Sequence, residues 1–131
     1  MADEPVDTVL VRYIVHDVDA ALAFYTTHLG FHVLMHPAPT FAILARGPLR
    51  LALSQPSKQG GGGQTLSDGR VPEPGGWNRF SLLVTDLEAT VTDLRGAGLT
   101  FRGDIVTGVA GRQILLDDPS GNPVELFEPN R

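Results

Sequence analysis

The amino-acid sequence predicts an α+β fold of two βαβββ modules in tandem, forming curved mixed sheets around a cleft. The main observation behind this prediction is an internal repeat, because residues 15–20 (VHDVDA) correspond to residues 84–89 (VTDLEA) at an offset of 84 − 15 = 69. The same offset relates three apolar helix positions in each half, Val18, Leu22 and Tyr25 against Leu87, Val91 and Leu94. Repetition at a fixed offset indicates duplicated supersecondary units. The second observation is a stretch rich in glycine and proline, residues 57–76, between halves of similar pattern.

The first module covers about residues 8–56. A β-branched and apolar run predicts a strand over 8–15. Asp17 then has the chemistry of a helix N-cap, and apolar residues at i, i+4 and i+7 predict a helix over 18–28 that ends at Gly30. Three further strands, separated by Pro37, Pro39 and Gly47–Pro48, are predicted over 31–35, 40–44 and 49–53.

The second module, about residues 77–129, repeats this order. A strand is predicted over 79–84, and a helix over 87–97 follows the N-cap Asp86 and ends at Gly98. Strands near Thr100, over 112–116 and over 124–127 complete the module, with a strong turn signal at residues 118–122. Residues 57–76 are predicted to be a flexible linker, and its glycines at 60–63 lack the Gly-Lys-Ser or Gly-Lys-Thr of a phosphate-binding loop.

Length and composition predict a single domain, residues 1–131, in the cytoplasm. The 131 residues are enough to bury a hydrophobic core. A formal charge of −5 argues against nucleic acid and anionic membranes as partners, and mildly favours a cationic ligand. The absence of cysteine excludes thiol catalysis, disulfides and zinc–thiolate sites. There is neither a signal-peptide pattern nor an apolar stretch approaching the roughly 18 residues of a membrane span.

Two segments carry a resemblance to a known family. Residues 15–19 (VHDVD) lead into Phe24–Tyr25 and residues 29–31 (LGF), and residues 118–126 read DPSGNPVEL. With the repeat, these motifs cover nearly the whole chain, which resembles the vicinal oxygen chelate superfamily of glyoxalases, extradiol dioxygenases, fosfomycin-resistance enzymes and bleomycin-resistance proteins. The resemblance implies a small-molecule cleft. By likeness to the bleomycin-resistance proteins, it also implies a homodimer with shared clefts.

The resemblance further implies where a metal would be bound. Metal-dependent members use four inward-facing strand residues, mostly His and Glu, two from each module. The corresponding positions in this chain are Leu10, Ala52, Arg79 and Glu125. Because this set offers one carboxylate, two hydrocarbons and a guanidinium, we predict no metal and no other cofactor. Arg79 and Glu125 are expected to form a charge-assisted pair instead, with contact of either side chain to a ligand as the alternative.

The four histidines do not restore a metal site. His32 and His36 would lie roughly 13 Å apart on one face of a strand, beyond the span of one coordination sphere. His28 falls in the last turn of a helix, and His16 precedes an N-cap at an exposed position. We therefore interpret all four as structural or exposed residues.

Alternation along the predicted strands adds further candidates for ligand contact. Arg12 would share the inward face of Leu10, with Glu125, an anionic ligand group or solvent as its partner. Gln113 and Leu115 would share the face of Glu125, and Phe41 would form an apolar wall. Trp77, the single tryptophan, either lies at the rim of the cleft or packs in the core.

The sequence therefore predicts a protein that binds a small organic molecule in a metal-free cleft, sequestering an antibiotic or a metabolite. The candidate contact residues are Leu10, Arg12, Phe41, Ala52, Trp77, Arg79, Gln113 and Glu125. The alternative is a divergent lyase, isomerase or dioxygenase in which Glu125 is the one acid–base candidate, because no nucleophile motif is present. A third interpretation is a dimeric module with a degenerate cleft.

Overall fold

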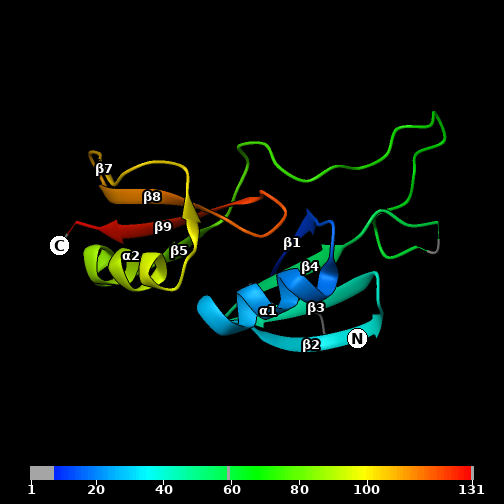
Figure 1. Cartoon of the computed structure of the whole chain (residues 1–131), viewed down its shortest axis with the longest axis horizontal. Helices are drawn as coiled ribbons and strands as arrows, with labels where there is room; N and C mark the ends of the chain where they lie inside the picture. Colours follow the sequence, from blue (N-terminus) through cyan, green and yellow to red (C-terminus); the bar gives the residue numbers. More distant parts are fainter. Residues whose placement is uncertain (1–7, 59, 131) are drawn as a thin grey trace. The chain divides into compact units, whose positions relative to one another are not determined.

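The computed structural model describes residues 8–58 and 60–130, which fall into two compact units divided between Pro74 and Gly75. Each unit is an open mixed sheet with one helix against one of its faces (Figure 1). The predicted α+β class and the duplication are thereby confirmed. In the following, the face that carries no helix of its own unit is called the helix-free face.

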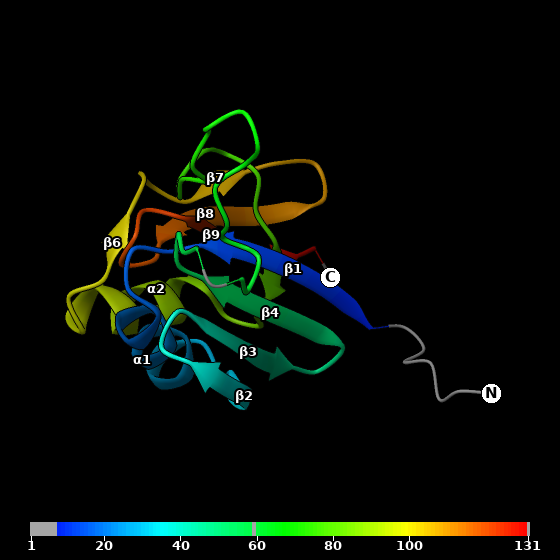
Figure 2. The same ribbon diagram turned by 90° about the vertical axis from the view of Figure 1, so that its right-hand side faces the viewer.

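The first unit has a sheet of four strands. Its elements are β1 (Val9–Ile14), α1 (Val18–His28), β2 (His32–Ala38), β3 (Phe41–Arg46) and β4 (Leu49–Ser54). The strand order is β1-β4-β3-β2, as Figure 2 shows, with β1 parallel to β4 and the other pairs antiparallel. Leu44, Leu51 and Leu53 are buried on the helix side of this sheet, together with the α1 residues Phe24 and Tyr25.

The second unit has a sheet of five strands. Its elements are β5 (Ser81–Leu83), α2 (Leu87–Gly96), β6 (Thr100–Phe101), β7 (Val106–Thr107), β8 (Gly111–Asp117) and β9 (Pro123–Pro129). The order is β5-β9-β8-β6, and β7 also pairs with β8. The predicted α2 stripe of Leu87, Val91 and Leu94 is buried, as are Ile114 and Leu126 from the central strands. Burial of these apolar side chains holds the helix on the sheet.

The predicted helix ends are confirmed in both units. Asp17 accepts a hydrogen bond from the backbone N–H of Ala20 at 3.2 Å, and Asp86 accepts one from Ala89 at 3.1 Å. Gly30 has φ of +73°, in the left-handed conformation that ends helices. The backbone N–H of the next residue, Phe31, returns to the carbonyl of Tyr25.

Each helix has a second N-terminal hydrogen bond that follows the repeat. The backbone N–H of Val18 donates to Gln55 Oε1 at 2.8 Å, and the N–H of Leu87 donates to Glu128 Oε1 at 2.8 Å. These acceptors come from the residue after β4 and from β9, so the last strand of each unit fixes the start of its helix. Glu128 also contacts Arg112, whose pKa is raised by its hydrogen bond to Glu88 and by the charge of Glu128.

Three expectations from the sequence differ from the structure. Strand β2 continues through Pro37, because it is an edge strand with irregular register, where a residue without an N–H is tolerated. Strand β5 is shorter than predicted and starts at Ser81. Strand β7 was not predicted, since two residues are too short to show a strand period.

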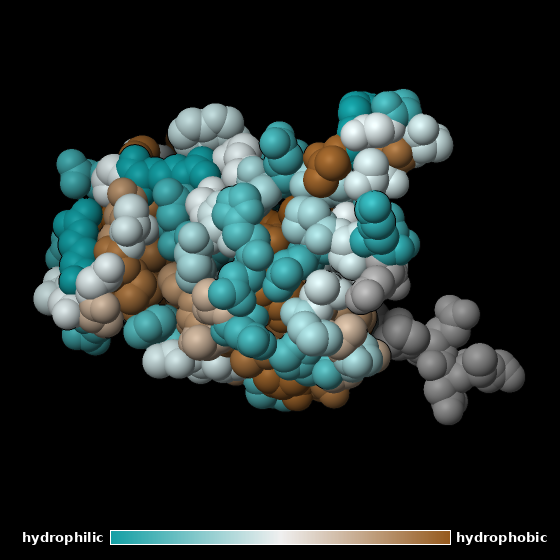
Figure 3. Space-filling model, turned by 45° about the vertical axis from the view of Figure 1, so that its right-hand side comes forward, coloured by the Kyte–Doolittle hydropathy of each residue, from teal (hydrophilic) through white to brown (hydrophobic). Residues whose placement is uncertain are grey.

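The exposed surface of the described residues is mixed. On the face seen in Figure 3, hydrophobic areas are separated by polar ones. The edge strand β2 exposes Val33, Leu34 and Met35. Among the residues described, neither helix is long and apolar enough to cross a membrane.

Candidate functional site

The helix-free face of the second sheet carries the strongest polar cluster of the predicted site. Strand pairing aligns Ser81 with Glu125 across the parallel β5–β9 pair, and Leu115 with Glu125 across the antiparallel β8–β9 pair. Gln113 lies two residues from Leu115 and therefore faces the same way. The predicted shared face of Gln113, Leu115 and Glu125 is confirmed by this register.

Glu125 is the centre of this cluster, and both of its carboxylate oxygens have partners. Arg79 donates from Nε at 3.1 Å and from Nη2 at 2.8 Å to Oε1. Ser81 Oγ donates to Oε2 at 2.7 Å. The side chains of Arg79 and Glu125 are 27% and 12% exposed, so the ion pair is largely removed from water. The predicted contact between Arg79 and Glu125 is therefore present.

Ser81 was missed as a functional candidate, although the repeat contains a signal for it. Ser81 lies 81 − 12 = 69 residues after Arg12, and Arg12 pairs with Ala52 as Ser81 pairs with Glu125. The two units thus present corresponding positions with different chemistry. The second unit has the polar pair Ser81 and Glu125 at these positions, whereas the first unit has a charged arginine beside the alanine Ala52.

The residues present do not fit the metal that the fold family implies. At the four corresponding positions, Leu10 and Ala52 have no donor atom, and Arg79 directs its guanidinium at the one carboxylate, Glu125. Within residues 8–58 and 60–130, no three His, Asp or Glu side chains form a group that could hold a metal ion. His36 instead lies 3.9 Å from Asp19.

Trp77 lies at the surface, since 68% of it is exposed, which rules out the core-packing interpretation. The guanidinium of Arg102 lies over its ring, 4.8 Å from the centroid. Arg102 also donates to the carbonyl of Gly76 at 2.7 Å and to that of Gly121 at 2.8 Å, and it pairs with Asp117 at 2.6 Å. Arg102 therefore fixes the segment that leads to Arg79. Nothing local in the sequence indicates this role.

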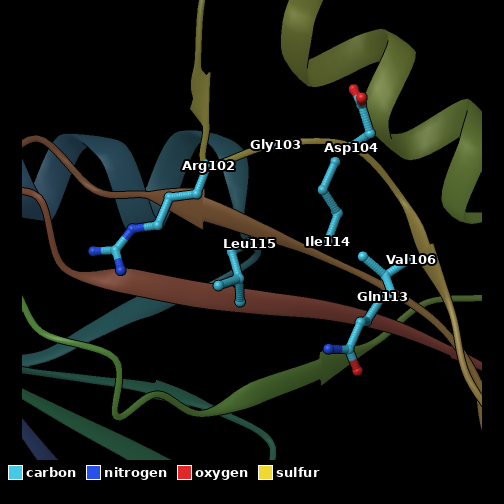
Figure 4. A pocket seen from close by; sticks show the side chains of 7 residues that line it. All are labelled: Arg102, Gly103, Asp104, Val106, Gln113, Ile114 and Leu115. Carbon is cyan, nitrogen blue, oxygen red and sulfur yellow. The ribbon is translucent and has the colours of Figure 1, made fainter.

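A pocket of about 190 Å³ adjoins the cluster along β8. It lies where β8 passes from its pairing with β7 to its pairing with β6, and residues 102–106 bridge that interval. Figure 4 shows Gln113 and Leu115 on one side of β8 and Ile114 on the other, with Val106 beside Gln113. Its size suits part of a small molecule rather than a whole one.

The first unit places the other predicted residues on its own helix-free face. Pairing aligns Leu10 with Arg50, Arg12 with Ala52, and Phe41 with Ser54. Leu10 is exposed and Ala52 is fully buried. Glu125 is engaged inside the second unit, so it does not need Arg12 as its partner.

The glycine-rich segment packs against this face, which its composition does not indicate. Ser54 Oγ donates to the carbonyl of Gly61, and a Cβ placed on Gly61 would lie 3.0 Å from Phe41 Cβ. A Cβ on Gly62 would collide with the guanidinium of Arg12. Both residues also have a positive φ, +83° at Gly61 and +90° at Gly62, which favours glycine at these two positions.

The sequence and the fold both match those of known proteins. The sequence pattern of the Glyoxalase/Bleomycin resistance protein/Dioxygenase superfamily matches residues 7–126. A search of curated protein sequences finds no match. Among solved structures, a member of this superfamily from Sphaerobacter thermophilus DSM 20745 is similar, with 28% identity, a TM-score of 0.71 and coverage of 92% of this chain and 95% of that one.

Two further structures are similar over nearly their whole length. An antibiotic binding protein from Streptomyces sp. CB03234 shares 25% identity with a TM-score of 0.69, covering 99% of each chain. A lactoylglutathione lyase from Agrobacterium tumefaciens shares 19% identity with a TM-score of 0.71, covering 96% of each chain. At that identity the lyase supports the fold alone.

Proposed function

Since the chain belongs to the Glyoxalase/Bleomycin resistance protein/Dioxygenase superfamily, we propose that it binds a small organic molecule without a metal, sequestering an antibiotic or a metabolite. The observation that carries this proposal is the contact of Arg79 and Ser81 with Glu125. These two side chains satisfy the carboxylate that a metal would otherwise use.

The same contacts favour binding over catalysis. A general base needs a free oxygen lone pair directed at the proton that it removes. Both oxygens of Glu125 already accept hydrogen bonds, one set from a guanidinium and one from a hydroxyl. The alternative, a divergent lyase, isomerase or dioxygenase, would have to use the remaining lone pair of Oε2, which accepts only the one bond from Ser81.

The surroundings of the pair suit recognition of an apolar or aromatic ligand. The exposed ring of Trp77, the pocket beside Gln113 and the partly exposed Leu115 give apolar surface next to a few oriented polar groups. The similarity to an antibiotic binding protein supports an antibiotic as one ligand class. A homodimer and a cytoplasmic location belong to this proposal as further expectations.

Trp77 allows a direct test of ligand binding. Because it is the single tryptophan, a change in its fluorescence reports on this part of the molecule alone. A library of antibiotics and metabolites is screened by thermal shift, and each hit is titrated against native protein and Gln113→Ala, which alters the pocket beside the pair. We expect at least one hit to change Trp77 fluorescence with saturation and to bind the variant more weakly. A screen without any such hit would contradict the proposal.

The metal-free state has its own test. Purified protein is dialysed against zinc, nickel, iron(II) or manganese(II) and analysed by inductively coupled plasma mass spectrometry. We expect far less than one equivalent per chain, because three of the four positions offer no usable lone pair. One equivalent of metal in the native protein, lost in Glu125→Gln, would overturn this part of the proposal.

A further inference from the structure

The first unit carries cations on its sheet and no carboxylate. Strands β1–β4 contain Arg12, Arg46 and Arg50 but no Asp or Glu. The excess of acidic residues therefore lies elsewhere in the chain. Since exposed charges are screened over about 8 Å at physiological ionic strength, the net charge of the whole chain does not by itself determine which ligand charge this sheet favours.

Arg12 differs from the other arginines of this sheet in its surroundings. It is exposed on the helix-free face, beside Ala52 in the register. Within residues 8–58 and 60–130, no carboxylate lies at ion-pair distance from Arg12 and no acceptor takes a hydrogen bond from it. By contrast, Arg50 on the same face donates to the carbonyl of Gly47 at 2.7 Å.

Gly62 lies against this unpaired guanidinium. A Cβ on Gly62 would be almost equally close to Nη1, Cζ and Nε of Arg12, so the glycine lies over the flat face of the group. The N–H groups at the edge of the guanidinium are then left for another acceptor. Five N–H donors in one plane match a planar carboxylate in bidentate geometry.

We propose that Arg12, which lies against Gly62, anchors the carboxylate of a small organic acid on the helix-free face of the first sheet. The apolar side chains of Phe41 and Ile14 on the same face would contact the body of that ligand. This inference rests on the proposed function, because it names the ligand class. It also reverses the expectation of a cationic ligand drawn from net charge.

The test uses two probes of the same shape, 1-naphthoate and the neutral 1-naphthamide. Both are titrated into ¹⁵N-labelled full-length protein, and the Nε–Hε signal of Arg12, assigned by its loss in Arg12→Gln, is followed by NMR. For native protein we expect naphthoate to bind at least tenfold more tightly and to shift this signal. In Arg12→Gln the preference should fall to about one, whereas Arg46→Gln, on the opposite face, should keep it.

Two glycine variants separate a positioned guanidinium from a simple positive charge. Gly62→Ala and Gly69→Ala share nearly the same backbone strain, with φ of +90° and +91°, but only Gly62 lies against Arg12. We expect Gly62→Ala to reduce the preference for naphthoate and Gly69→Ala to leave it unchanged. An equal preference in native protein and Arg12→Gln, or no preference in native protein, would overturn the inference. The proposed function has a separate test, because it is contradicted by a ligand screen without a hit that changes Trp77 fluorescence and binds Gln113→Ala more weakly.

Discussion

The pair formed by Arg79 and Glu125 allows a quantitative test of the site in the second unit. Arg79→Ala removes two hydrogen bonds to Glu125 Oε1, of 3.1 and 2.8 Å, and leaves the carboxylate with Ser81 alone. Breaking a fully buried pair costs about 3–5 kcal/mol, and hydrogen bonds to charged groups contribute about 1.5–3 kcal/mol. Because Arg79 is 27% exposed, water can reach the vacated oxygen, and we expect a loss of about 2 kcal/mol in the free energy of unfolding.

A double-mutant cycle isolates the interaction. The free energy of unfolding is measured in urea for native protein, Arg79→Ala, Glu125→Gln and the double variant, by circular dichroism and by Trp77 fluorescence. We expect the double variant to lose about 1 kcal/mol less free energy of unfolding than the sum of the single changes. The reason is that removing either side chain already leaves the other without its ion-pair partner.

The chain offers a matched control for this cycle. Arg70 Nε lies 2.8 Å from Asp68 Oδ2, but these side chains are 77% and 53% exposed. An exposed pair of this kind is screened by water, so the cycle of Arg70→Ala and Asp68→Asn should give a coupling energy near zero. A coupling for Arg79 and Glu125 no larger than this control would refute the argument that burial makes the pair significant.

Three further predictions concern packing, the turn and assembly. Gly63→Ala should lower the free energy of unfolding by about 2 kcal/mol or more, because its Cβ would collide with the backbone carbonyl of Gln55. Gly96→Ala, whose Cβ meets no atom and whose φ is not positive, should cause no such loss, and an equal loss would contradict this reasoning. Asp118→Ala should lower the free energy of unfolding, measured in urea, by about 2–3 kcal/mol. The Asp118 carboxylate accepts hydrogen bonds from the backbone N–H groups of Ser120 and Asn122 and from the Asn122 side chain. A loss under about 0.5 kcal/mol would contradict this prediction. Sedimentation equilibrium at tens of micromolar should give about twice the 14.0 kDa of one chain, whereas a mass near 14.0 kDa would exclude the homodimer.

The parts of the fold that follow from short-range chemistry were predictable from the sequence. Asp17 and Asp86 satisfy backbone N–H groups three residues later, and Gly30 adopts a backbone conformation that other residues disfavour. The resemblance to metal-dependent members, carried onto both repeats, also brought Arg79 and Glu125 together correctly, although they are 46 residues apart. In a repeat, comparing equivalent positions helps to predict which residues far apart in the sequence lie close together.

The missed features depend on tertiary contacts that have no local signal. The role of Arg102 arises from its contacts with Gly76, Gly121 and the ring of Trp77, which lie far from it in the sequence. Likewise, four successive glycines are typical of a flexible linker, and only the structure shows that Gly61 and Gly62 lie against strand side chains.

The hydrogen bond from the last strand to the start of each helix shows what duplication has preserved in this chain. Gln55 and Glu128 differ in charge, yet each places an oxygen 2.8 Å from the same backbone N–H of its helix. An amide oxygen and a carboxylate oxygen can both accept this hydrogen bond, so the architecture requires an acceptor atom at this place and does not fix its charge. The positions on the helix-free faces have no such shared requirement. Arg12 and Ser81 accordingly differ in chemistry, and the two repeated units present surfaces of different charge.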